Sequence, residues 1–241
     1  MSEMRASRLQ AVHWTTLRPR LDVLKALHAS CITSLPANYI YPTTSELYRI
    51  PFVQNIIDSV PSTSSFTQDN LEPVRLDFRN LILSWREDME LKLVDLIRAG
   101  SYTNSGEEVD RESMFNLATS LFSCCTCLRF LRYPQVLRHA CATQNTFMEG
   151  TDLDVKVMNY LGETFWNHKG CIAVNVYHVS LLVHLLSMAD LNWTTTTVQE
   201  LNARNPIFEC ISCNDVRQGR ATMTWDRVVC PWFFSRVIIT Q

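Results

Sequence analysis

The sequence predicts a mainly α-helical protein with little strand, in which cysteine-bearing segments interrupt the helices. Apolar residues recur at helical spacing along much of the chain, most regularly over residues 74–98. The chain has 241 residues but only 6 glycines, which is few for a β-barrel or for a nucleotide-binding fold built on glycine-rich turns. With 46% hydrophobic residues, it is long and apolar enough to bury a core.

The first part of the chain predicts three helices. Residues 5–31 carry leucines at helical spacing, and Pro19 is expected to break or kink this helix. A second helix is expected over 44–57, split or kinked at Pro51. The strongest helix covers 74–98, where an apolar stripe faces a charged one.

A polar segment over 100–110 predicts the main boundary, between a helical N-terminal region, 1–100, and a cysteine-bearing helical region, 101–241. The helices expected in the second region cover 111–122, 131–141, 152–165 and 171–190, with a short one from Val198 that Pro206 ends.

Charge and hydropathy exclude several classes of protein. The net charge of −2 gives no overall electrostatic reason to bind nucleic acid. The most apolar stretch, 171–189, is interrupted by Asn175, His178 and His184, so it predicts a buried helix rather than a membrane span. Without a secretory signal, we expect the cytoplasm or the nucleus, where nine cysteines are better explained as metal ligands and core residues than as disulfides.

One stretch of the sequence carries ligands for a metal ion. Cys124 and Cys127 have the Cys-x-x-Cys spacing with which a tight turn grips zinc, and His139 and Cys141 follow about a dozen residues later. These four residues predict a tetrahedral Zn²⁺ site, provided that a turn or a helix end lies between His139 and Cys141. Cys125 is expected to be a spectator.

A second Cys-x-x-Cys pair repeats the local pattern. Cys210 and Cys213 follow Phe208 as Cys124 and Cys127 follow Phe122, and Cys230 is available as a third ligand. No fourth ligand is apparent, so this second site is expected to be incomplete. An alternative is a single four-thiolate site built from the two Cys-x-x-Cys pairs.

At these residues the chain resembles a large family of fungal F-box-containing proteins from mushroom-forming species. The resemblance covers roughly residues 70–229. It rests on Ala118-Thr119, Phe122, Cys124, Cys127, Tyr133-Pro134, His139 and Cys141, and then on Thr195–Leu201, Phe208, Cys210, Cys213 and Met223-Thr-Trp225. The chain lacks a Leu-Pro-x-Glu-like F-box opening and the histidine that the family pattern places soon after Trp225. The resemblance implies a protein partner related to ubiquitin ligases.

These observations together predict an irregular multi-helix protein with one or two zinc-knuckle-like cysteine knots. The function that fits best is a non-enzymatic protein-interaction module stabilised by zinc. One alternative is a nucleic-acid-binding zinc protein, for which Arg129, Arg132 and Arg138 form the nearest approach to a basic patch. A cysteine-dependent enzyme ranks last, because no glycine-rich loop or nucleophile motif accompanies the cysteines.

Overall fold

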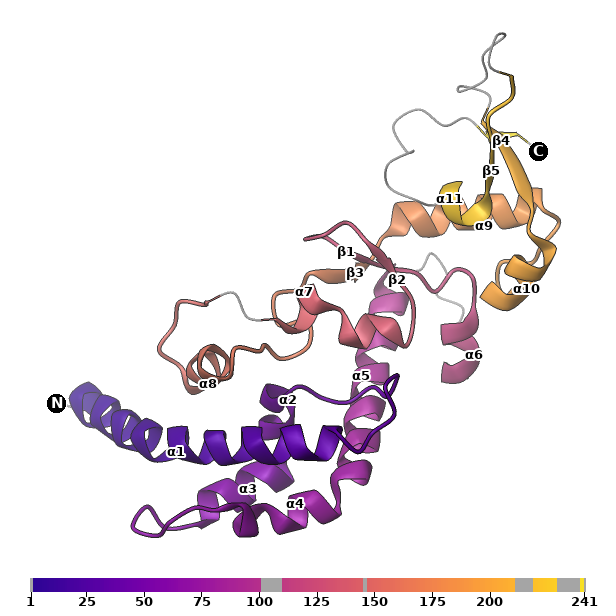
Figure 1. Cartoon of the computed structure of the whole chain (residues 1–241). Coiled ribbons are helices and arrows are strands. Elements are labelled where there is room, and N and C mark those ends of the chain that lie inside the picture. The colour runs from indigo at the N-terminus through magenta and orange to yellow at the C-terminus, as the bar shows by residue number, and fades with distance from the viewer. Residues whose placement is uncertain (1, 101–109, 145–146, 211–218, 229–238, 241) are drawn as a thin grey trace. The chain divides into compact units, whose positions relative to one another are not determined.

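The computed structural model describes residues 2–100, 110–144, 147–210, 219–228 and 239–240, and it confirms that the protein is mainly α-helical (Figure 1). The chain forms two compact units, Met1–Met89 with Leu137–Gly170, and Glu90–Val136 with Cys171–Gln241. Each unit therefore combines two separate stretches of sequence. The division into 1–100 and 101–241 stays a prediction, and its boundary falls inside the second unit.

The first unit is almost entirely helical, and the predicted division at Pro51 is confirmed because Ile50 ends one helix and caps the next. Its helices are α1 (Ser2–Ile32), α2 (Thr44–Arg49), α3 (Pro51–Ser59), α4 (Glu72–Leu76), α7 (Ala140–Thr143) and α8 (Leu153–Leu161), with the 3-10 turn η1 (Gln68–Leu71). The long helix α5 (Phe78–Gly100) has residues in both units, and the 3-10 turn η2 (Gln135–Arg138) precedes α7.

An apolar core holds these helices together. Leu17, Leu21, Leu24 and Leu27 form one face of α1, and each is at most 1% exposed. They belong to a cluster with buried residues from α2, α3, α5 and α8. The expected break at Pro19 does not occur, since α1 continues through it, and the alternative of a kink stays a prediction. Proline costs the helix one backbone hydrogen bond. Burial of the leucine face on both sides of Pro19 outweighs this cost and keeps the helix continuous.

A buried carboxylate ties three segments of the first unit together. Glu46 of α2 is 6% exposed, and its Oε2 accepts a hydrogen bond from the Trp85 indole N–H at 3.0 Å. Its Oε1 accepts a second hydrogen bond from the backbone N–H of Trp166. A buried carboxylate is tolerable only when donors replace the water it has lost, and here both oxygens have one.

We expect Glu46→Gln to destabilise the protein by about 2–3 kcal/mol. The NH2 group of the glutamine would face either the Trp85 indole N–H or the Trp166 backbone N–H, and two donors cannot form a hydrogen bond with each other. Urea denaturation followed by circular dichroism measures the change. Glu87→Gln, on the exposed face of α5, is the matched control and is expected to stay within about 0.5 kcal/mol of wild type. An equal stability of the Glu46→Gln variant and the wild type would contradict the role of this carboxylate.

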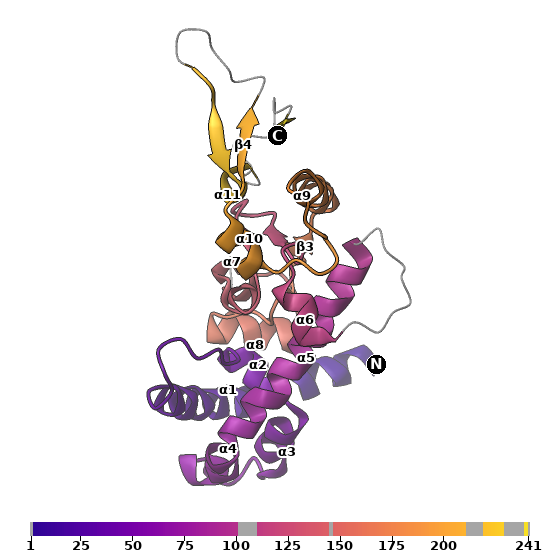
Figure 2. The same ribbon diagram turned by 90° about the vertical axis from the view of Figure 1, so that its right-hand side faces the viewer.

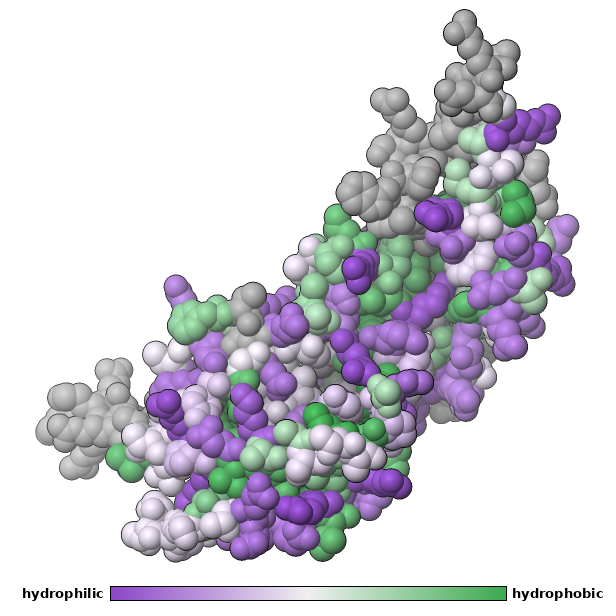
Figure 3. Space-filling model, in the orientation of Figure 1, coloured by the Kyte–Doolittle hydropathy of each residue, from purple (hydrophilic) through white to green (hydrophobic). Residues whose placement is uncertain are grey.

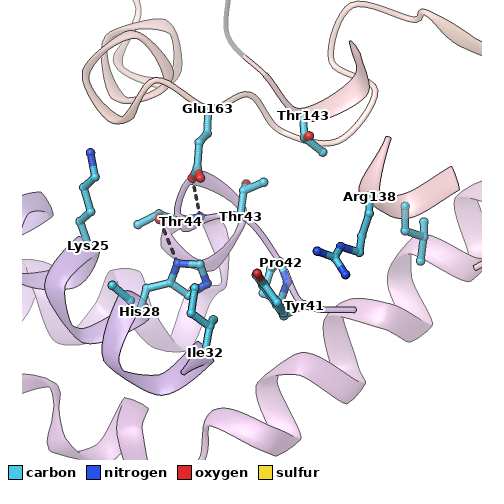
Figure 4. Close-up of a pocket in the computed structure, with 12 residues that line it drawn as sticks. Lys25, His28, Ile32, Tyr41, Pro42, Thr43, Thr44, Arg138, Thr143 and Glu163 are labelled. Atoms are coloured by element: carbon cyan, nitrogen blue, oxygen red, sulfur yellow. Dashed lines mark hydrogen bonds between the residues drawn. The ribbon is translucent and has the colours of Figure 1, made fainter. Parts of the chain in front are cut away.

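A buried histidine forms a second polar connection in the same unit, at one side of a surface pocket (Figure 4). The Nδ1 atom of His28 lies 3.0 Å from the Thr44 hydroxyl, and the Thr44 N–H donates to Glu163 Oε2 at 2.7 Å. Burial lowers the pKa of His28, while the Glu163 carboxylate and the Pro42 carbonyl oppose that shift. His28 is therefore held in its neutral form near neutral pH.

This lowered pKa predicts a loss of stability in mild acid. The unfolded chain takes up a proton at His28 near its ordinary pKa of about 6.5, whereas the folded protein resists it, so stability falls as pH drops below about 6.5. We expect His28→Asn to reduce the dependence of the urea midpoint on pH between 7.5 and 5.5. His13→Asn, on the exposed face of the same helix, should keep the wild-type slope. Identical slopes for all three proteins would contradict the prediction.

The second unit contains two small antiparallel sheets. The first has the order β2-β1-β3 and the second β5-β4-β6, and β4 and β5 lie side by side in Figure 2. The strands are β1 (Phe122–Cys124), β2 (Phe130–Leu131), β3 (Ile172–Val174), β4 (Ile207–Cys210), β5 (Thr222–Thr224) and β6 (Ile239–Thr240). The other helices are α6 (Arg111–Asn116), α9 (Val176–Met188), α10 (Val198–Arg204) and α11 (Trp225–Val228).

Several predicted helices are wrong over part of their length. The segment 111–122 is helical only over Arg111–Asn116, and Phe122 already belongs to β1. The segment 131–141 is not one helix, because it forms the end of β2, the turn η2 and the start of α7. The segment 171–190 begins as β3, which pairs with β1, and becomes helical only after Asn175, whose side chain accepts hydrogen bonds from the first helical N–H groups. Strand pairing and a capping side chain therefore override the apolar pattern.

The end of α5 packs closely against the first sheet. A Cβ atom at Gly100 would lie only 2.6 Å from the Val174 side chain, so glycine is needed for the approach. Large apolar side chains stay exposed in this unit, among them Leu128, Tyr177 and Ile207. On the face shown in Figure 3, hydrophobic residues are interspersed with hydrophilic ones.

Among the residues that the structure describes, no helix combines the length and the hydropathy that crossing a bilayer requires.

Candidate metal centre

Four side chains from the stretch 124–141 converge on one point. The sulfur atoms of Cys124, Cys127 and Cys141 and a ring nitrogen of His139 all lie within 4.8 Å of one another. Ligands in a tetrahedral zinc site are separated by about 3.3–3.8 Å, given metal–ligand bonds of about 2.0–2.3 Å. Shifts of about 1 Å would close the group on an ion. The structure therefore brings together the four residues of the first predicted site, and they could hold a metal ion.

A tight turn after β1 positions the first two thiols. The N–H of Leu128 donates to the Cys124 carbonyl at 2.9 Å, and the N–H of Cys124 donates to the Arg129 carbonyl at 3.0 Å. The turn requires a left-handed backbone at Leu128, where φ is 58°. Such a conformation costs a non-glycine residue about 1–2 kcal/mol. Because the Leu128 side chain is 61% exposed, its packing in the core does not offset this conformational cost.

The beginning of a short helix positions the other two candidate ligands. His139 is the N-cap of α7, with an extended backbone at φ −65° and ψ 122°. Its carbonyl accepts hydrogen bonds from the N–H of Ala142 at 2.9 Å and from the Thr143 hydroxyl at 3.3 Å. Cys141 follows as the second residue of α7. The close spacing of His139 and Cys141 is thus bridged by a helix end, which is the geometry that the predicted site requires.

Burial varies across the four candidate ligands. Cys124 is 1% exposed, His139 and Cys141 are half-buried, and Cys127 is exposed. The sheet supports the buried side, where Phe122 is fully buried and β1 pairs with both β2 and β3. One side of the centre is therefore anchored in the second unit's first sheet, while Cys127 faces solvent. Cys125, also exposed, is not a member of the group.

A further cysteine, absent from the predicted set, lies against this centre. Cys171 is 4% exposed, and its carbonyl accepts a hydrogen bond from the Cys125 N–H at 2.9 Å. Burial raises the pKa of the Cys171 thiol to about 11, and its neighbours Cys124 and Cys125 add to the rise. Nothing in the spacing along the sequence links Cys171 to Cys124; only the pairing of β1 with β3 does.

The second predicted site falls largely outside the described residues. Cys213 and Cys230 lie outside the described residues. The second site and the alternative four-thiolate site therefore stay predictions. Cys210 ends β4, as Cys124 ends β1, and each strand is the central one of a three-stranded antiparallel sheet. Phe122 and Phe208, two residues before these cysteines, are 0% and 2% exposed. The sequence repeat thus corresponds to a repeated strand environment.

Two histidines of the apolar stretch are not members of the cysteine–histidine group. His178 packs edge-on against Phe130, with ring centroids 4.5 Å apart, and burial lowers its pKa. His178 and His184 both lie on α9, and neither belongs to the cysteine–histidine group.

The fold and the site together define a mainly helical protein with a cluster of three cysteines and one histidine. Comparisons with models of protein families, with curated proteins and with solved structures found no match. The function of the protein must therefore be inferred from the geometry of the cluster.

Proposed function

We propose that this protein is a non-enzymatic protein-interaction module in which a structural Zn²⁺ ion holds a knuckle formed by Cys124, Cys127, His139 and Cys141. The convergence of these four side chains is the observation that carries the proposal. Four protein ligands fill a tetrahedral zinc site, whereas catalytic zinc sites keep a position open for water or substrate. The ligand set therefore favours a structural ion.

The lengths of the surrounding elements support a structural role for the metal. Strand β2 has 2 residues, and η2 and α7 have 4 residues each. Elements this short are not stable alone, because the entropy of ordering them exceeds what one or two hydrogen bonds return. A bound ion would supply that stability, since the free energy of metal binding becomes free energy of folding.

The residues of the basic patch weigh against the nucleic-acid alternative. Arg132 donates hydrogen bonds to the carbonyls of Leu117, Ala118 and Ser120, so its guanidinium is engaged inside the second unit. Arg138 stacks over the Tyr41 ring, 5.6 Å from its centroid. With the Arg132 guanidinium engaged by these carbonyls, the three arginines are not all available to a phosphate backbone.

A cysteine-dependent enzyme is also less well supported. Such an enzyme pairs one thiolate with one base. Here three thiols surround one imidazole, which is a composition typical of metal ligation rather than of nucleophilic catalysis. Cys31, Cys124, Cys125, Cys127, Cys141 and Cys171 form no disulfide, and we propose a reducing compartment, the cytoplasm or the nucleus.

The zinc site is tested by replacing one ligand and its neighbour in turn. We expect Cys127→Ser to remove one zinc ion per chain by elemental analysis and to raise amide hydrogen exchange over 122–143, because the ion would no longer link the short elements. Cys125→Ser, at an exposed position in the same turn, should keep both the zinc and the protection. A wild-type protein without zinc and with thiols that titrate freely would contradict the proposal.

The interaction role is tested separately by affinity capture followed by mass spectrometry, with the Cys127→Ser variant as the metal-free comparison. We expect the wild type to recover a defined protein partner that the variant loses. A ubiquitin-ligase scaffold among the partners would support the relation implied by the F-box family resemblance. Salt-dependent binding of RNA or DNA without a protein partner would support the nucleic-acid alternative instead.

A further inference from the structure

Cys171, which directly precedes β3, and Cys124 of β1 form a buried pair of thiols. They are 4% and 1% exposed, and their side chains are joined by a hydrogen bond. The backbone fixes this contact from both sides, because Cys124 pairs with Ile172 in the β1–β3 ladder and the Cys125 N–H donates to the Cys171 carbonyl at 2.9 Å. The contact is therefore a consequence of the sheet register.

The chemistry of a zinc site determines which of the two sulfur atoms donates this hydrogen bond and which accepts it. A cysteine bound to zinc is a thiolate, which can accept a hydrogen bond but has no proton to donate. If Cys124 ligates zinc, Cys171 must be the donor. Cys171 is not needed as a ligand, since Cys124, Cys127, His139 and Cys141 already complete a tetrahedral set.

We propose that Cys171 is a positioning residue of the zinc centre, whose S–H group donates a hydrogen bond to the Cys124 thiolate and holds that sulfur in its ligating orientation. This inference rests on the proposed zinc site. It extends the centre beyond its four ligands to β3, which leads directly into α9.

The burial of Cys124 explains why such a donor is useful. A thiolate that is 1% exposed cannot be solvated by bulk water, so its charge must be stabilised by the metal and by neighbouring donors. Donors of this kind also fix the orientation of the ligand, and their removal typically lowers metal affinity about 10- to 100-fold. The exposed Cys127, by contrast, has access to water.

The test compares Cys171→Ser with Cys171→Ala in the full-length protein. The two replacements are similar in size, but only serine can donate a hydrogen bond to the Cys124 sulfur. Zinc affinity is measured by competition with a chromophoric chelator, and the Co²⁺-substituted proteins report the sulfur-to-metal charge-transfer bands. We expect the alanine variant to bind zinc about 10- to 100-fold more weakly than wild type and to shift these bands, and serine to restore most of the affinity.

Two controls separate packing from hydrogen bonding. Cys171→Val fills the site with a larger apolar side chain that has no donor, and it should resemble the alanine variant in zinc affinity. Cys31→Ala removes a buried cysteine of α1, which is not in the group, and should leave zinc affinity unchanged. Equal affinities for the serine, alanine and valine variants would overturn the role of Cys171, whether all match the wild type or all fall below it.

The wild-type measurement distinguishes the two levels of the hypothesis. Wild-type protein that binds no zinc would overturn the proposed zinc site and this inference with it. Tight zinc binding by the wild type, together with tight binding by the Cys171→Ala variant, would overturn only the role of Cys171.

Discussion

The convergence of three thiols and one imidazole is the interaction on which our interpretation of the molecule depends. Cys124 is held by the β1 ladder, while His139 and Cys141 belong to a helix start of only 4 residues. Hydrocarbon burial alone cannot order such short elements, so in our proposal a zinc ion joins them. The exposed Leu128, with its left-handed backbone, then follows from the turn that presents Cys127 beside Cys124.

Both units bury an apolar core, but they build it from different elements. In the first, long helices bury a continuous leucine-rich core, and Glu46 and His28 are satisfied by specific partners within it. In the second, strands of 2 to 4 residues form two small sheets, each with a buried phenylalanine two residues before a cysteine. In our proposal, four protein ligands occupy every position of the metal site and leave none for water or substrate. This is why we favour protein interaction over catalysis.

Local sequence signals were sufficient for much of the fold and for the four clustered residues. The Cys-x-x-Cys spacing and the position of His139 and Cys141 depend only on nearby residues, and the division at Pro51 follows from proline's own geometry. The pairing of strands that are far apart in the sequence could not be predicted from such local signals. The apolar run after Cys171 predicts a helix, yet its first residues pair with β1, and the contact of Cys171 with Cys124 comes only from that register.

The most direct test of the zinc centre is X-ray absorption at the zinc edge. It should use full-length protein in which Cys210, Cys213 and Cys230 are replaced by serine, so that only the first ligand set remains. We predict three sulfur ligands at about 2.3 Å and one nitrogen ligand at about 2.0 Å. A shell of oxygen and nitrogen alone, or of four sulfur atoms, would contradict a centre formed by Cys124, Cys127, His139 and Cys141.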